Sequence, residues 1–252
     1  MNMTPENRAA VEPEPAGMGE FSRIVGVFFE PSKTFADIAQ RPGWMVPLIL
    51  TILAAMAFSM AVAQHIGWDR VVRHQFETNS RLQQMPQEQK DQAIALQVRI
   101  ASVSAYAAPV IFVPLADIIM AAVLLGIAGG IMSGGMRFKQ VFAVVCYGGL
   151  PAVISGILKV VVIFLKNPED IAIENPLPFF NLGALMDPNT PSKALYAFAS
   201  SMDLFTIWGI LLMATGLKAA AGKRLSFAGA LVAVVLPWLV FVLGTSALAK
   251  LR

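Results

Sequence analysis

The chain has 252 residues, of which 56% are hydrophobic and 14% are charged, and its mean hydropathy is +0.65. Ordinary soluble domains carry about 25% charged residues, so this composition excludes a water-soluble globular core and predicts a polytopic membrane protein. The net charge of +3 would suggest a nucleic-acid partner in a soluble protein. Here the cations flank apolar segments, where topology and anionic lipid account for them, and no nucleic-acid partner is expected.

The first 44 residues divide into two units. Residues 1–19 are polar and rich in proline and glutamate, which predicts a disordered tail without a cleavable signal peptide. Residues 20–44 form an amphipathic segment that is too short to span a bilayer, and we expect it to lie in the membrane interface with Arg23 and Lys33 at the phosphates. The predicted membrane-contact residues are its large apolar side chains: Phe21, Ile24, Val25, Phe28, Phe29 and Phe35.

Residues 45–66 form the first predicted membrane span. At about 1.5 Å per residue this run is long enough to cross a hydrocarbon core of about 30 Å. The next segment, Gly67 to Ser102, is polar and carries five cations and four acids. We expect an extramembrane helical hairpin here, whose second helix starts after Pro86 and continues into the second span.

The second and third predicted spans, residues 109–133 and 138–165, share a pattern of small residues at four-residue steps. Small residues at this spacing let two helix backbones approach closely, so we expect the two spans to pack against each other. Pro151 is expected to kink the third span. The predicted packing residues lie in or directly after these spans: Gly126, Gly130, Gly134, Gly148, Ala152 and Gly156.

The last two predicted spans are residues 201–221 and 227–249. They follow a segment, residues 166–200, whose five prolines exclude a long helix. From Leu204 to Leu217 the chain runs without a charge, and the link from Lys218 to Ser226 holds three cations and no acid. The sequence thus predicts an all-α bundle of five transmembrane helices over residues 45–249.

The charges of the short links predict the orientation. With a cytoplasmic N-terminus, the two short cytoplasmic links contain cations and no acids, as the positive-inside rule requires. The competing signal is the polar segment between the first two spans, which also holds five cations but is longer and balanced by acids. We therefore expect the N-terminus to be cytoplasmic and the C-terminus to lie outside, in the inner membrane if the source is prokaryotic. The link cations are Arg137, Lys139, Lys218, Lys223 and Arg224.

Three ionisable side chains, Asp117, Lys159 and Asp203, fall within apolar spans. Each would cost about 2.5 to 3.5 kcal/mol at the centre of an isolated helix. The alternating directions of the spans place all three in the same half of the bilayer, so they can form a charge cluster that holds three helices in register. Two alternatives remain open, namely that Lys159 extends alone to the interface, or that the three residues line a proton or ion pathway.

The residue types needed for catalysis do not occur in useful patterns. His65 and His74 are the two histidines, nine residues apart and without a paired acidic motif, so no metal site is predicted. The single cysteine, Cys146, lies in an apolar run and is interpreted as a small buried side chain. The glycines repeat at helix-packing spacing within the spans, which does not indicate a phosphate-binding loop. We expect no enzymatic activity and no cofactor.

Several short motifs, in their order along the chain, resemble those of the Yip-domain family, whose eukaryotic members were named for interacting with Ypt/Rab GTPases. The resemblance covers about Phe21 to Leu248 and implies five spans, a cytoplasmic N-terminus and no known catalytic reaction. The short tail and the alanine-rich spans are more similar to prokaryotic members of unknown role, so Rab binding is not carried over. The motifs are Phe29–Ile38, Pro42–Trp44, Gly134–Gly135, Phe138–Val141, Pro151 and Asp203–Trp208.

Two functional hypotheses follow from these observations. In the first, the chain is a non-enzymatic membrane protein that acts through helix packing and contacts with lipid or with membrane or cytoplasmic proteins, and a homo-oligomer is possible. Its process would be membrane organisation or trafficking. In the second, the chain is a small transporter or channel that uses Asp117, Lys159 and Asp203.

Overall fold

The computed structural model describes residues 17–171, 177–186 and 192–249, so most of the predicted tail, residues 1–16, lies outside the described residues. Within the described ranges the regular elements are helices, and the single β-bridge joins Asn181 to Asp203. Five helices are long and apolar enough to cross a membrane. The protein is therefore a multi-pass integral membrane protein, and the predicted all-α bundle with five spans is confirmed.

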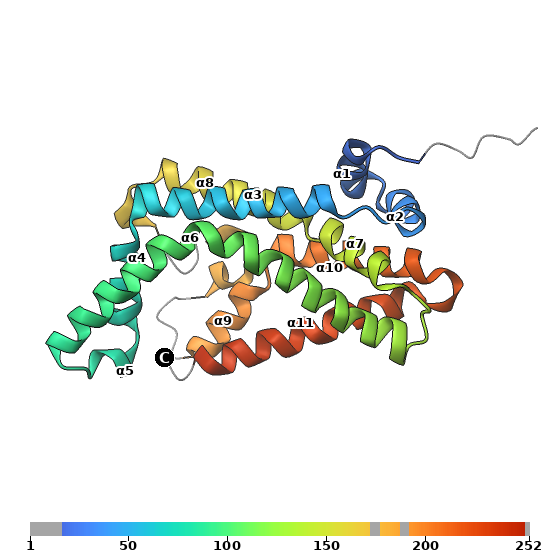
Figure 1. The fold of residues 1–252 in the computed structure, drawn as a ribbon. Helices are drawn as coiled ribbons and strands as arrows, with labels where there is room; N and C mark the ends of the chain where they lie inside the picture. The colour runs from blue at the N-terminus through green and yellow to red at the C-terminus, as the bar shows by residue number, and fades with distance from the viewer. Residues whose placement is uncertain (1–16, 172–176, 187–191, 250–252) are drawn as a thin grey trace, which may run out of the picture.

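The chain begins with two short helices, α1 (Glu20–Phe29) and α2 (Pro31–Gln40), which pack against each other. Pro31 occupies the first position of α2, where its missing amide hydrogen leaves no hydrogen bond unmade, so it separates the two helices without weakening either. We call residues 20–40 the N-terminal hairpin. It lies at one end of the bundle, beside α7 and α10 (Figure 1).

The first span is α3 (Met45–Ala61), which continues as a π-helix to Ile66. It leads into α4 (Trp68–Thr78) and the short α5 (Ser80–Gln83) at the opposite end of the bundle (Figure 1). Here α4 packs on the first turns of α6 (Gln87–Leu124), where Val72, Phe76 and Ile94 form a small core. The structure thus contains the helical hairpin expected between the first two spans, and α6 begins directly after Pro86.

The second and third spans are both irregular. Helix α6 passes through Pro109 and Pro114 and ends in a π-helix over Leu125–Ile131. The third span is broken into α7 (Phe138–Gly148) and α8 (Leu150–Leu165). The break falls at Gly149, because Pro151 cannot donate to the preceding turn and sits in the first turn of a new helix. The structure thus has a one-residue break at Gly149 where the sequence predicted a kink at Pro151.

The fourth and fifth spans complete the bundle. Helix α9 (Lys193–Ser201) precedes α10 (Leu204–Ala221), and α11 (Phe227–Ala249) follows the basic turn. The buried core is centred on α7, where every residue from Val141 to Gly148 is buried. Helices α2, α6 and α10 all pack on α7, so the N-terminal hairpin is attached to the most deeply buried part of the fold.

Candidate functional site

The N-terminal hairpin is docked on the bundle through one fully buried face. Val27, Phe35 and Ile38 are all 0% exposed and belong to the main core. Phe35 points at Gly216 of α10, where an added Cβ would lie 2.9 Å from the Phe35 ring. The prediction that Phe35 contacts the membrane interface is therefore wrong, because α2 turns this face of the amphipathic segment toward α10 and α7.

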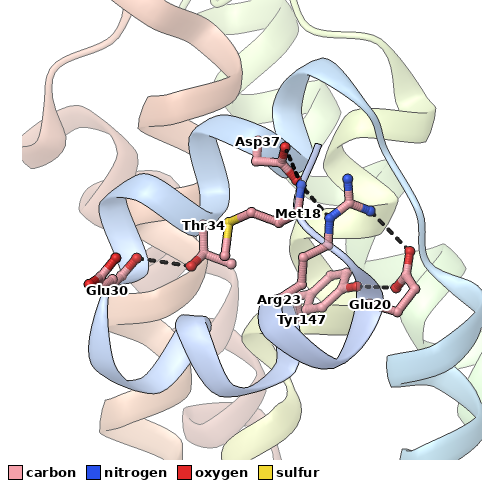
Figure 2. A network of polar contacts seen from close by, with 7 residues as sticks. All are labelled: Met18, Glu20, Arg23, Glu30, Thr34, Asp37 and Tyr147. Carbon is pink, nitrogen blue, oxygen red and sulfur yellow. Dashed lines mark hydrogen bonds and ion pairs between the residues drawn. The ribbon is translucent and has the colours of Figure 1, made fainter. Parts of the chain in front are cut away.

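A polar network fixes α1 to α2 and to the bundle (Figure 2). Arg23 donates from Nε to Asp37 at 2.7 Å and from Nη1 to Glu20 at 3.0 Å. The hydroxyl of Tyr147, which is 0% exposed, donates to the second oxygen of Glu20 at 2.6 Å. The backbone N–H of Met18 completes the set by donating to Asp37 at 3.2 Å. One guanidinium thus links α1 to α2, and one carboxylate links α1 to α7.

Arg23 is 5% exposed, so the expectation that it lies at the lipid phosphates is wrong. Burial acts to lower the pKa of the guanidinium, but the hydrogen bond to Asp37 and the charges of Asp37 and Glu20 outweigh it and raise that pKa above its usual value. Arg23 therefore stays charged and paired. Amphipathic spacing alone placed it on a polar face, but that face is covered by α2 and by the chain around Gly43, where a Cβ would lie 3.0 Å from Nη1.

The opposite side of α1 leaves three large apolar side chains uncovered. Phe21 is 79% exposed, Phe29 is 81% exposed and Val25 is 40% exposed. Their four-residue spacing places them on one helix face, which we call the α1 apolar row. Ile24 and Phe28, also predicted as interfacial, instead pack partly against the core, and the Phe28 ring lies 5.2 Å from that of Trp208.

The basic links lie at the same end of the bundle as the N-terminal hairpin (Figure 1). Gln140, in the first turn of α7, donates to the carbonyl of Ala39 at 2.8 Å and so joins the first link to α2. Helix α10, which α2 contacts, runs into the second link. Five exposed cations therefore lie in or beside the two links at this end of the bundle: Arg137, Lys139, Lys218, Lys223 and Arg224.

The three intramembrane charges do not meet in one cluster. Asp117 of α6 accepts a long hydrogen bond from the thiol of Cys146, with 3.8 Å between sulfur and oxygen. Asp203 caps α10, accepting from the N–H of Phe205 at 2.9 Å and from the N–H and hydroxyl of Thr206. Lys159 of α8 lies over the Phe58 ring, 6.0 Å from its centroid. Among the described residues no ion pair joins any two of these three side chains.

Lys159 and Asp203 nevertheless line one cavity of about 590 Å³ at the centre of the bundle. All five spans contribute to its wall, and the segment around Leu177 and Asn181 adds to it. Asp117 is absent from this lining, because its side of α6 faces α7. Two of the three predicted charges thus share a cavity without touching, and the third is separate from them.

The small residues pack differently from the prediction. A Cβ at Gly126 or Gly130 would meet nothing within 4 Å, so these two glycines do not form a helix contact. The π-helix at Leu125–Ile131 changes the turn angle, so a four-residue step no longer follows one face. Gly134 makes room only for its own segment, since a Cβ there would lie 2.5 Å from the carbonyl oxygen of Ala128. The predicted contact between the second and third spans exists between α6 and α7, but these glycines do not make it.

In the third span, Gly148 does allow close packing, but against α10, where a Cβ would lie 3.2 Å from the Met213 nitrogen. Gly156 is in ordinary contact with Ala54 of α3, and Ala152 lines the cavity. Sequence analysis missed the α10 side of this interface. A Cβ at Gly209 would lie 3.1 Å from the Gly148 carbonyl, and the seven-residue spacing of Gly209 and Gly216 was the available signal.

The remaining candidate residues, His65 and Cys146, have structural contacts. His65 lies at the end of the first span, where its Nε2 is 2.9 Å from the carbonyl oxygen of Lys166 and joins that span to the third. Cys146 is 2% exposed beside Asp117. Nowhere in the described ranges do three His, Cys, Asp or Glu side chains gather closely enough to hold a metal ion.

The chain was compared with protein-family models, with curated proteins and with solved structures. The family model described as the Yip1 domain matches residues 25–248, which includes α2 and all five spans. Neither the curated proteins nor the solved structures gave a match. The matched region covers most of the 252 residues and agrees with the five-span helical architecture. The chain therefore belongs to the Yip1 domain family.

Proposed function

We propose that this Yip1-family protein is a non-enzymatic membrane organiser that acts through contacts made at the end of the bundle carrying the N-terminal hairpin. The α1 apolar row supports this proposal most directly, since two phenylalanines and a valine stand uncovered on a helix that is otherwise firmly docked. An apolar face of this kind would be unfavourable if it were exposed to water. Beside a bilayer, or against a partner protein, the same face gains free energy when it is covered.

The size of this gain can be judged from the side chains. Full burial of one phenylalanine contributes about 1.5 to 3 kcal/mol, so Phe21 and Phe29 together contribute about 3 to 6 kcal/mol. Each cation near an anionic leaflet adds about 1 kcal/mol. Because the Arg23 network holds α1 in place, little conformational entropy is lost when the row is covered. The hairpin end is thus suited to contact a cytoplasmic leaflet or a protein at its surface.

The proposed orientation places the N-terminal hairpin in the cytoplasm and the C-terminus outside. The five exposed link cations at the hairpin end support it by the positive-inside rule. An odd number of spans then puts the two termini on opposite sides of the membrane. In a prokaryote this membrane would be the inner membrane.

Transport is the weaker of the two hypotheses. A pathway through Asp117, Lys159 and Asp203 needs the three side chains along one route, whereas the cavity holds Lys159 and Asp203 and leaves Asp117 elsewhere. Asp203 is also occupied by the three hydrogen bonds that cap α10. The geometry therefore favours a contact-making protein over a carrier of protons or ions.

Spin labelling in nanodiscs tests the lipid-contact part of the proposal. Cys146 is replaced by alanine, and single cysteines are placed at Phe21, at Phe29 and, as a control on α2 of the same hairpin, at Lys33, whose charged side chain is 73% exposed. We expect labels at positions 21 and 29 to be accessible to oxygen and shielded from a water-soluble nickel reagent, and the label at 33 to show the reverse. Equal accessibility to the nickel reagent at all three positions would show that the row does not touch lipid.

A crosslinking and co-purification survey in the native membrane tests the partner-contact part. The double variant Phe21→Ser/Phe29→Ser is compared with Ser22→Ala and with the wild type. We expect the double variant to lose protein or lipid associations that Ser22→Ala retains, with the same amount of protein inserted. Identical association profiles in all three proteins would refute the role of the α1 apolar row.

A further inference from the structure

We propose that the central cavity binds the anionic headgroup of a phospholipid, with Lys159 as the cation that recognises its phosphate. This inference concerns a different part of the molecule from the α1 apolar row and does not depend on the proposed function. At about 590 Å³, the cavity falls within the range of sites that hold small organic molecules.

The cavity is more polar at one end than elsewhere. Most of its polar residues come from α8, from the start of α10 and from the segments before it, and Thr51 of α3 is the exception: Thr51, Ser155, Lys159, Asn181, Ser200, Asp203 and Thr206. The other walls are formed mainly by small or apolar residues, among them Ala54 and Ala55 of α3, Met213 of α10 and Val234 of α11. A site with this division fits an amphiphile, whose charged group and hydrocarbon part need different surroundings.

The charges at the polar end leave a cation without a carboxylate partner. Asp203 supplies a carboxylate to the lining, but its oxygens accept from the N–H groups of Phe205 and Thr206 and from the Thr206 hydroxyl, and it forms no ion pair with Lys159. The positive end of the α10 dipole further balances its charge. Lys159 forms no ion pair with any described residue, and its contact is the face of the Phe58 ring.

An unpaired lysine within a span is unfavourable, and an anion bound beside it would reduce that cost. A bound phosphate would supply the missing charge through a charge-assisted hydrogen bond with Lys159. The lipid bilayer around the bundle contains such anions, because each anionic phospholipid carries a phosphate group linked to acyl chains. A free inorganic anion would leave the apolar walls uncovered, which favours the lipid.

The test measures lipid binding to the full-length protein in mild detergent. Wild-type protein is incubated with equal amounts of phosphatidylglycerol and phosphatidylcholine, and the bound lipid is identified by native mass spectrometry. We expect at least a tenfold preference for phosphatidylglycerol. Lys159→Met, which keeps the length and removes the charge, should lose that preference, while Lys159→Arg should keep it. Because methionine carries no charge to bury, this variant should insert and fold as the wild type does.

Three controls separate the cavity from other sources of binding. Lys166→Met removes an exposed cation seven residues later, directly after the end of α8, and should leave the preference intact. Ala152→Phe places a ring in the cavity lining and should weaken binding of phosphatidylglycerol although every charge remains. Excess inorganic phosphate should not displace the lipid.

Three outcomes would overturn the inference. The first is equal phosphatidylglycerol binding by wild type and Lys159→Met, which would show that this lysine recognises nothing. The second is an equal loss in Lys166→Met, which would indicate a surface effect. The third is full displacement by inorganic phosphate, which would show that the site takes a free anion. None of these results depends on whether the α1 apolar row touches lipid, so the two proposals fail separately.

Discussion

The substitution Arg23→Met tests whether the buried network holds the N-terminal hairpin on the bundle. Methionine preserves much of the aliphatic packing, so the change removes mainly the two hydrogen-bonded ion pairs. The bond to Asp37 is 2.7 Å long, and the Asp37 side chain is only 18% exposed, so we assign it about 1.5 to 3 kcal/mol. The Glu20 side chain is 43% exposed, so this second pair adds at most about 1 kcal/mol. The expected loss is about 3 kcal/mol.

Hydrogen exchange of the α1 amides in nanodiscs measures this loss directly. Since 1.4 kcal/mol corresponds to a factor of ten, a loss of about 3 kcal/mol should speed the exchange of these amides about 100-fold. The α11 amides should be unaffected, because α11 is not among the helices that contact the hairpin most closely.

Lys33→Met is the matched control. It also breaks an ion pair within the hairpin, between Lys33 and Glu30, but these side chains are 73% and 60% exposed. Exposed pairs contribute about 0 to 1 kcal/mol, so α1 exchange should change less than about fivefold. Equal acceleration by Arg23→Met and Lys33→Met, or unchanged exchange in both, would show that burial of Arg23 does not hold α1 in place.

Three further predictions concern the core and the membrane charges. Tyr147→Phe removes the hydroxyl that donates to Glu20 and should speed hydrogen exchange of the α1 amides by about tenfold, which is the effect of losing one hydrogen bond to a charged group. An unchanged exchange rate would show that this hydrogen bond does not help to hold α1 on the bundle. Gly216→Ala should lower the melting temperature in detergent, because its Cβ would lie 2.6 Å from a Val144 methyl group. Gly126→Ala should not lower it, because its Cβ would meet nothing. A lower melting temperature for Gly126→Ala than for Gly216→Ala would contradict the packing described for α10. Proteoliposomes containing wild type or Asp117→Asn should both show no proton or solute flux above empty vesicles, and flux lost in the variant would restore the transport hypothesis.

The number and rough position of the spans could be predicted because they depend on local properties. A run of about 20 apolar residues crosses a bilayer wherever its neighbours lie, and every backbone group in that run must be satisfied within a helix. The same holds for the break at Gly149. Pro151 cannot donate a hydrogen bond, whatever packs around it, and this favours an interruption near this position, although α6 and α11 continue through prolines of their own.

The rotation of each helix about its axis could not be predicted in this way. Phe35 and Phe29 have the same chemistry in one amphipathic segment, yet Phe35 is fully buried and Phe29 is 81% exposed. The difference arises because α2 is folded back on α1 and turns its apolar face toward Gly216. The sequence pattern shows which residues are apolar, but it does not show which segment of the chain packs over them.

The candidate site shows the same division. The sequence identified Asp117, Lys159 and Asp203 because a charge in an apolar run stands out without any structure. Which of them meet depends on helix order and tilt, and the structure brings Lys159 and Asp203 to one cavity while Asp117 contacts Cys146. Arg23 was misplaced for the related reason that its partner Asp37 lies 14 residues away, beyond the reach of a helical-spacing argument.

By itself, the sequence determined that this protein has lipid as its solvent, that it crosses the membrane five times, and where proline interrupts a span. These properties follow from hydrophobicity and backbone hydrogen bonding, which act over one or two helical turns. Only the tertiary structure decided that Arg23 is buried, that the α1 apolar row is exposed, and that Lys159 shares a cavity with Asp203 without forming an ion pair with it. Those features depend on close packing between segments that are distant in the chain, where each helix is oriented by all its neighbours together.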